Sequence, residues 1–407
     1  MSYVNPFEDE EEYGPSSNYF VRHWKGQNSL PFAYWVNGSL VNLGLVGGVN
    51  LLQDRIENSD ASLRIMATTG LILILVSLIA WVWSSVGIWR SATRHPYRGG
   101  SGGWATVAKG ILILGCLGMV ARTPNLFLLT RELGQLAAGN DPLGKSASIT
   151  MRPGGVMQVD GFLSQGFADR FATALKANPG VRVLALNSPG GRIVEGERFA
   201  RQAKDSGLDT IVEGECSSAC ILPFLAGKNR LLGANARLGF HQPTAPGASQ
   251  AERQEGIDAF RDSMIKAGVS RSFSYQALTA APDDMWYPDL RTLFEAGVVT
   301  GLDRSAIVSD NEISAKSLNR NLPKRLDAYT SLTGVRANGT MLEYSHEVTI
   351  PAAQVDAGAQ GKLREAVTND VCSNPEIVMM VKAGAIYRYI YRDSRGIVVA
   401  QFDIARC

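Results

Sequence analysis

The chain has 407 residues, of which 45% are hydrophobic and 19% are charged, and its 40 basic and 38 acidic residues leave a formal net charge of +2. This length allows a membrane module and about two folded domains, at roughly 100–200 residues per domain. The even charge balance excludes a general electrostatic binder of nucleic acid, which would carry a basic excess. The 42 Gly and 17 Pro residues have no triplet period, which excludes a collagen-like chain.

The first part of the chain predicts a membrane module. Residues 1–30 begin with an acidic run, Glu8 to Glu12, and we expect them to be disordered. The longest uncharged apolar run, residues 65–89, would reach about 37 Å as a helix, enough to cross a hydrocarbon core of roughly 30 Å. We predict a module over residues 31–130 with spans at about 31–53, 65–89 and 104–122. The third span requires Lys109 to reach the membrane interface, and two spans are the alternative.

The loops between these runs predict the orientation. Residues 90–109 contain no acid and four basic residues, Arg90, Arg94, Arg98 and Lys109, whereas the loop at 54–64 has mixed charge. The positive-inside rule places the basic loop in the cytoplasm. With three spans, the N-terminus is then cytoplasmic and everything after about residue 125 lies outside. With two spans, the large domain would be cytoplasmic.

Four cysteines follow the predicted spans, and an even number fits disulfides in an oxidising compartment. Cys216 and Cys220 are four positions apart, a separation that a helix or tight turn brings within bonding range. Cys372 and Cys407 flank the last segment. We predict disulfides Cys216–Cys220 and Cys372–Cys407; four free thiols in a cytoplasmic domain are the alternative. We expect no metal site, because no Cys or His pair stands close by at ligand spacing.

From residue 145 the pattern alternates between strands and helices. Residues 181–186 form a continuous apolar run, typical of a parallel strand buried on both faces. Further strands are expected at 156–159 and 209–213, and helices at 167–176, 193–206 and 218–226. This alternation predicts an α/β domain with a parallel sheet.

Three motifs lie where these strands end. The S-P-G-G run at 188–191 can expose backbone N–H groups, although such a glycine turn is often only structural. Ser217 and Ser218 stand among small residues at a strand-to-helix junction, where a serine is either a helix cap or an exposed nucleophile. His241 follows the next strand, and alone it would be a hydrogen-bonded structural residue. The joint occurrence favours catalysis.

In this order the motifs resemble the Clp protease proteolytic subunit and its membrane-associated relatives on the crotonase-like fold, over about residues 150–303. A closer resemblance is to an exported group with C-x-S-A-C around the serine. The resemblance implies an acyl-enzyme mechanism on peptides, with no metal or cofactor. It implies Ser218 as nucleophile, His241 as base, Asp284 as acid with Asp283 as the alternative, and oxyanion donors at Gly190, Gly191 and Ala219.

The chain departs from Clp subunits in its predicted spans and in the cysteines beside the serine. The stretch between His241 and Asp284 is also short, so the segment that builds the Clp double ring is absent or shortened. Residues 312–407 read as a separate small α+β domain with a helix at 362–369 and strands at 342–350, 386–393 and 396–403. It resembles small exported bacterial domains.

The sequence therefore predicts a multi-pass protein of the bacterial cytoplasmic membrane with a periplasmic serine peptidase domain. Its partners would be the lipid bilayer and peptides or membrane-protein segments, and not nucleic acid; a homo-oligomer is allowed. The first alternative is a catalytically weak Clp-like peptide-binding scaffold or sensor of the cell envelope. The second is an acyl-CoA enzyme on the same fold.

Overall fold

The structure is a computed structural model that describes residues 15–57, 59, 61–245 and 248–407. The chain forms two compact units that divide near Pro142. The acidic run predicted to be disordered lies outside the described residues. Within the same predicted stretch, however, Tyr19–Trp24 forms helix α2, which Asn18 caps by accepting hydrogen bonds from the N–H groups of Phe20 and Val21. The prediction of disorder does not hold there.

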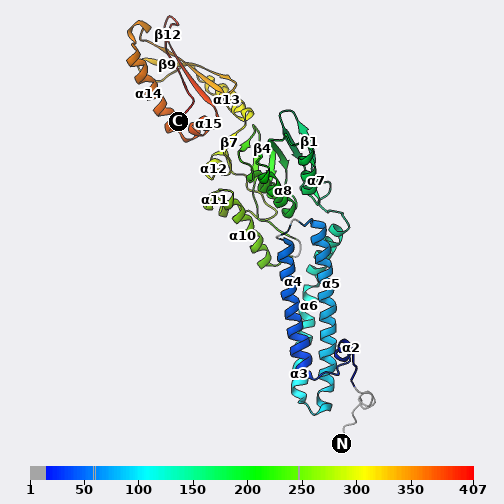
Figure 1. Cartoon of the computed structure of the whole chain (residues 1–407). Coiled ribbons are helices and arrows are strands. Elements are labelled where there is room, and N and C mark those ends of the chain that lie inside the picture. Colours follow the sequence, from blue (N-terminus) through cyan, green and yellow to red (C-terminus); the bar gives the residue numbers. More distant parts are fainter. Residues whose placement is uncertain (1–14, 58, 60, 246–247) are drawn as a thin grey trace. The chain divides into compact units, whose positions relative to one another are not determined.

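The first unit contains three helices long and apolar enough to cross a membrane, at Leu30–Ile56, Leu63–Arg94 and Gly102–Ala137. The first is built from α3 (Leu30–Phe32), a π-helical segment η1 (Ala33–Leu40) and α4 (Val41–Glu57). The others are α5 (Leu63–Arg94) and α6 (Gly102–Ala137), with the short η2 (Pro96–Arg98) between them. Figure 1 shows α4, α5 and α6 side by side. Helix α6 continues through Pro124 to Ala137, past residue 122, where the predicted span ends; the bounds of the span itself stay a prediction.

The second unit begins with a seven-stranded sheet in the order β1-β2-β3-β4-β5-β7, with β6 also paired to β4. Only the β1–β2 pair is antiparallel. The strands are β1 (Ser148–Arg152), β2 (Val156–Asp160), β3 (Val183–Ser188), β4 (Asp209–Ser217), β5 (Arg230–Leu232), β6 (Arg237–Gly239) and β7 (Gly301–Leu302). The predicted α/β class with a mostly parallel sheet is confirmed.

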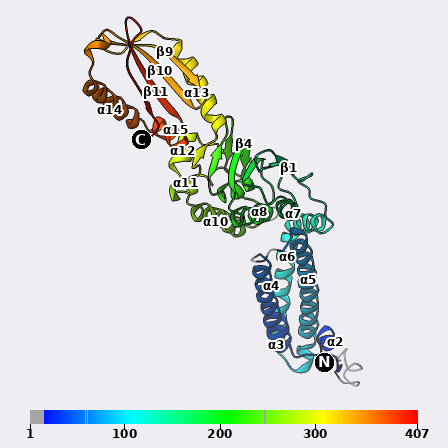
Figure 2. The ribbon, with the colours of Figure 1, turned by 45° about the horizontal axis from the view of Figure 1, so that its top comes forward.

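Helices connect and cover this sheet (Figure 2). They are α7 (Phe167–Ala177), α8 (Ile193–Asp205), η3 (Ser218–Cys220), α9 (Ile221–Leu225), α10 (Gln250–Lys266), α11 (Arg271–Gln276) and α12 (Leu290–Glu295). Helices α7 and α8 pack through Phe167, Phe171 and Phe199, all three fully buried, with ring centroids 4.4–6.4 Å apart. Because the strands from β2 onward run parallel, their carboxyl ends lie at one edge of the sheet.

The last part is a small α+β region with a five-stranded sheet in the order β12-β11-β10-β9-β8. Its strands are β8 (Lys324–Arg325), β9 (Thr330–Asn338), β10 (Met341–Val348), β11 (Ile386–Asp393) and β12 (Val398–Ile404). Its helices are α13 (Arg304–Asn319), η4 (Ala352–Gln354), α14 (Ala357–Ser373) and α15 (Pro375–Ala383). Strands β11 and β12 pair antiparallel, as their sequence pattern predicts, and β10 and β11 pair in parallel.

Candidate active site

The turn from β4 into η3 holds Ser218 in an unusual backbone conformation. Its φ is +57°, and it is the one non-glycine residue with positive φ in the described part of the chain. The left-handed region is unfavourable for residues with a Cβ, by about 1–3 kcal/mol. The fold therefore maintains a strained turn at this serine. The Ser218 side chain is partly exposed, whereas Ser217 beside it is fully buried.

His241 reaches Ser218 from the segment that follows β6. Strand β6 runs parallel to β4, with Gly239 opposite Ser217, so the residues just beyond each strand end come together. The His241 Nε2 atom lies 2.7 Å from the Ser218 Oγ atom, and the His241 Nδ1 atom lies 3.0 Å from the carbonyl oxygen of Pro282. A carbonyl oxygen only accepts hydrogen bonds, so Nδ1 carries the proton and Nε2 accepts from the serine hydroxyl.

Asp284, expected from the family resemblance as the acid of a triad, does not contact the histidine. Its carboxylate accepts a hydrogen bond from the N–H of Met285 at 2.7 Å. Within the described residues, neither Asp283 nor Asp284 forms a hydrogen bond or ion pair with His241. The backbone of Pro282 occupies the position next to Nδ1 because Phe240 and Trp286 exchange two backbone hydrogen bonds of 2.9 Å, which fix this segment beside the histidine.

The S-P-G-G loop packs directly against the serine turn. Gly190 has φ +102°, and a Cβ added there would lie 2.7 Å from the Ser218 Cβ and 3.1 Å from the Ala219 nitrogen. Only glycine allows this approach. The Gly190 N–H donates to the Ser188 Oγ at 3.1 Å, so it is already satisfied.

The hydrogen bonds that fix this turn do not use the other two expected donors, the N–H groups of Gly191 and Ala219. Gly191 has φ +146° and is held by Leu163, whose N–H donates to the Gly190 carbonyl at 2.8 Å and whose carbonyl accepts from the Arg192 N–H at 2.8 Å. Neither bond uses the Gly191 N–H. The Ala219 N–H lies in the first turn of η3, where helix N–H groups have no partner within the helix. Of the three expected oxyanion donors, Gly191 and Ala219 therefore remain available.

A network around Glu215 separates the roles of the two serines. The Ser217 hydroxyl donates to the Glu215 carboxylate at 2.7 Å, the Tyr287 hydroxyl donates to the same oxygen at 2.8 Å, and the Arg237 guanidinium binds the other oxygen. Burial raises the pKa of the Glu215 carboxyl, but these three hydrogen bonds together outweigh it and hold the pKa below its usual value. Ser217 thus serves this network and leaves Ser218 to face His241.

A disulfide between Cys216 and Cys220, both fully buried, brackets Ser218. The second disulfide joins Cys372 to Cys407, and Cys116 in α6 is a free thiol. These are the pairs that the cysteine spacing predicts. The described residues contain no group of three or more His, Cys, Asp or Glu side chains placed to hold a metal ion.

Two participants of this site were missed by the sequence analysis. The first is the Pro282 carbonyl, a backbone group that no side-chain motif can signal. The second is Glu215, two residues before Ser217. The sequence signal was weak, because a second carboxylate, Glu213, stands two positions earlier in the same strand.

No family model and no curated protein matches this chain. Among solved structures it is similar to ClpP1 from Listeria monocytogenes, with 19% identity over 36% of this chain and 90% of that chain and a TM-score of 0.32. A mutant of the same protein gives 20% identity, 37% and 91% coverage and the same TM-score. The type II secretion system pilotin AspS from Vibrio cholerae is similar over 25% of this chain and 92% of that chain, with 17% identity and a TM-score of 0.22. These likenesses concern fold alone, and the chemistry must be argued from the residues.

Proposed function

We propose that this protein is a membrane-anchored serine peptidase that cleaves peptides or membrane-protein segments on the extracytoplasmic side. The observation that carries the proposal is the 2.7 Å contact between the Ser218 Oγ and the His241 Nε2, made by a serine at φ +57°. A structural serine has no need for a strained turn, whereas a nucleophile benefits from one because it projects the hydroxyl towards a substrate.

The mechanism is acyl transfer. As the Ser218 Oγ attacks a peptide carbonyl carbon, its proton moves to the His241 Nε2, and the carbonyl oxygen becomes an oxyanion. The N–H groups of Gly191 and Ala219 stabilise this oxyanion. His241 then gives the proton to the leaving amine, which leaves an acyl-enzyme on Ser218. A water molecule, deprotonated by the same imidazole, then attacks the acyl carbon; the bond from that carbon to the Ser218 Oγ breaks, the imidazolium returns its proton to Oγ, and the acyl group leaves as a carboxylic acid.

The Pro282 carbonyl takes the orienting part that an acid has in a triad. It holds the Nδ1–H and thereby keeps Nε2 free to accept the proton. A neutral carbonyl stabilises the imidazolium that forms during the reaction less than a carboxylate does. Asp284 would complete a triad only if its loop moved towards His241.

The membrane attachment rests on three candidate spans, and the extracytoplasmic location on the basic loop between the second and third. Two disulfides in the second unit agree with an oxidising compartment.

Peptide hydrolysis tests the proposal. The purified full chain is incubated with an unfolded protein such as reduced, alkylated casein, and new termini are mapped by mass spectrometry. We expect cleavage by the wild type and by Ser217→Ala, and none by Ser218→Ala. Equal cleavage by Ser218→Ala and the wild type would show that a contaminating enzyme or another residue is responsible.

A further inference from the structure

The first unit contains a cavity of about 460 Å³ that the proposed peptidase chemistry does not use. Three parts of the chain enclose it: the start of the first candidate span, the end of α5 and the first turns of α6. The lining residues are Leu30, Pro31, Tyr34, Trp35, His95, Trp104, Val107, Ala108 and Ile111. Its size is within the usual range for sites that hold small molecules, roughly 300–1,000 Å³.

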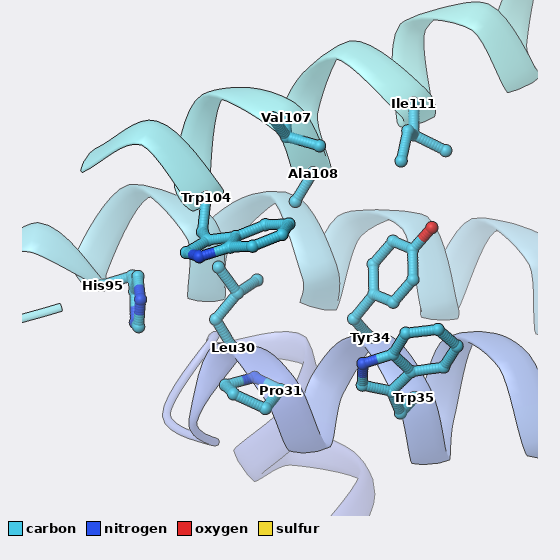
Figure 3. A pocket seen from close by; sticks show the side chains of 9 residues that line it. All are labelled: Leu30, Pro31, Tyr34, Trp35, His95, Trp104, Val107, Ala108 and Ile111. Carbon is cyan, nitrogen blue, oxygen red and sulfur yellow. The ribbon is translucent and has the colours of Figure 1, made fainter. Parts of the chain in front are cut away.

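The cavity is mainly apolar, with the His95 imidazole at one end and the Tyr34 hydroxyl among apolar side chains at the other. Figure 3 shows His95 and Trp104 together at one end, and Tyr34, Trp35 and Ile111 towards the other. Trp104 and Ile111 are seven residues apart on one face of α6, which corresponds to about 10 Å along the helix axis. One leaflet of the hydrocarbon core is about 15 Å deep. With Trp104 at the membrane interface, where tryptophan is favoured, the cavity would extend well into the hydrocarbon.

The charge at this end of the helices is entirely positive. Residues 13–53 and 61–131 contain no Asp or Glu. The basic residues near this end are Arg22, Lys25, Arg90, Arg94 and Arg98. Arg98 lies beside the cavity, because its guanidinium is 3.4 Å from the carbonyl oxygen of Asn28, two residues before Leu30. Such a basic end complements the anionic lipids of the cytoplasmic leaflet, which this loop faces in the predicted orientation.

We propose that this cavity binds one anionic glycerophospholipid of the cytoplasmic leaflet. One acyl chain lies between Trp35 and Ile111 inside the cavity, and the phosphate lies at the His95 end, in the field of the basic residues. A zwitterionic lipid offers the same acyl chain without net charge, and a free anion offers the charge without the chain. Neither matches both halves of the site.

The test uses the full chain in a neutral detergent, stripped of lipid, and native mass spectrometry with added dioleoyl phosphatidylglycerol or dioleoyl phosphatidylcholine. We expect one phosphatidylglycerol per chain, bound at least tenfold more tightly than phosphatidylcholine. Ala108→Phe, which fills the cavity from α6, should weaken phosphatidylglycerol binding at least tenfold. Gly110→Phe is the matched control. Gly110 does not line the cavity, and a Cβ added there meets open space. The affinity of this variant for phosphatidylglycerol should therefore stay within about twofold of the wild type.

Val107→Trp is a second cavity variant whose side chain is half exposed and so tolerates a larger group. It should also weaken binding, and it keeps the test decisive if Ala108→Phe does not fold. Equal affinity for the two lipids, or undiminished binding by a folded cavity variant, would overturn the proposal. Inorganic phosphate that displaces the lipid at millimolar concentration would also overturn it, because the site would then recognise the anion alone. Retained peptidase activity in Ala108→Phe would leave the proposed function untouched, so the two proposals fail separately.

Discussion

Replacing Asp284 by Asn measures how His241 is oriented. In a triad whose acid binds the base, neutralising that acid lowers kcat by about 10⁴-fold, because the histidine takes the wrong tautomer. Here the Pro282 carbonyl holds the Nδ1–H at 3.0 Å, so Asp284→Asn removes no hydrogen bond from the histidine. What remains is the attraction between an exposed carboxylate and the imidazolium, about 1 kcal/mol or less in a watery environment. We expect the rate to fall by no more than about fivefold.

The assay measures the second-order rate constant at which a fluorophosphonate probe labels the folded protein. This rate constant depends on the serine and its base, and its measurement requires no knowledge of the substrate. Asp283→Asn serves as the neighbouring control and should match the wild type. His241→Gln should label at least about 100-fold more slowly, since it removes the general base. A fall for Asp284→Asn as large as that for His241→Gln would refute this reasoning and show that Asp284 joins the histidine in the reactive state.

Three further predictions concern the surroundings of the site. Because the pKa of Glu215 is lower in the folded than in the unfolded chain, its stabilising effect is complete above the unfolded value near 4.3 and is lost as pH falls through the folded value. Glu215→Gln should therefore lower the free energy of unfolding at pH 7 by about 1–2 kcal/mol, and with it the Tm. In thermal melts, the difference in Tm from the wild type should shrink below about pH 4. Replacing Cys216 and Cys220 together by Ala should lower the free energy of unfolding by about 2 kcal/mol, by the chain-entropy argument. In a variant that circular dichroism shows to be folded, labelling by the fluorophosphonate probe should be at least tenfold slower. Unchanged labelling would contradict a role for this disulfide in holding the serine turn. Fusions at residue 140 should give active alkaline phosphatase and dark GFP in bacterial cells, and the reverse pattern would place the second unit in the cytoplasm.

The parts of the fold that depend on local patterns could be predicted from the sequence. Long apolar runs indicate spans because a helix must satisfy its own backbone in lipid, and the run at 181–186 indicated a buried parallel strand because both of its faces are apolar. The end of α6 could not be placed in this way. The predicted third span ends near residue 122, but proline frees only one or two backbone groups, and the helix continues through Pro124 to Ala137.

For the candidate site, the order of motifs on a parallel sheet brought Ser218 and His241 to the same edge, where the structure places them 2.7 Å apart. The acid could not be placed with the same reasoning. Its position depends on the pairing of Phe240 with Trp286, a contact between segments about 45 residues apart that neither segment signals alone. A register set by such a distant pairing brought the Pro282 carbonyl, and not a carboxylate, to the Nδ1 atom of His241.

The central claim is that Ser218 is a nucleophile activated by His241, and a covalent adduct tests it most directly. The purified full chain is treated with a fluorophosphonate, digested, and the modified peptide is sequenced by mass spectrometry, with a heat-unfolded sample as the control. We expect one adduct per folded chain, located on Ser218, and none after unfolding. An unlabelled folded chain, or an adduct on Ser217 or another serine, would contradict the account.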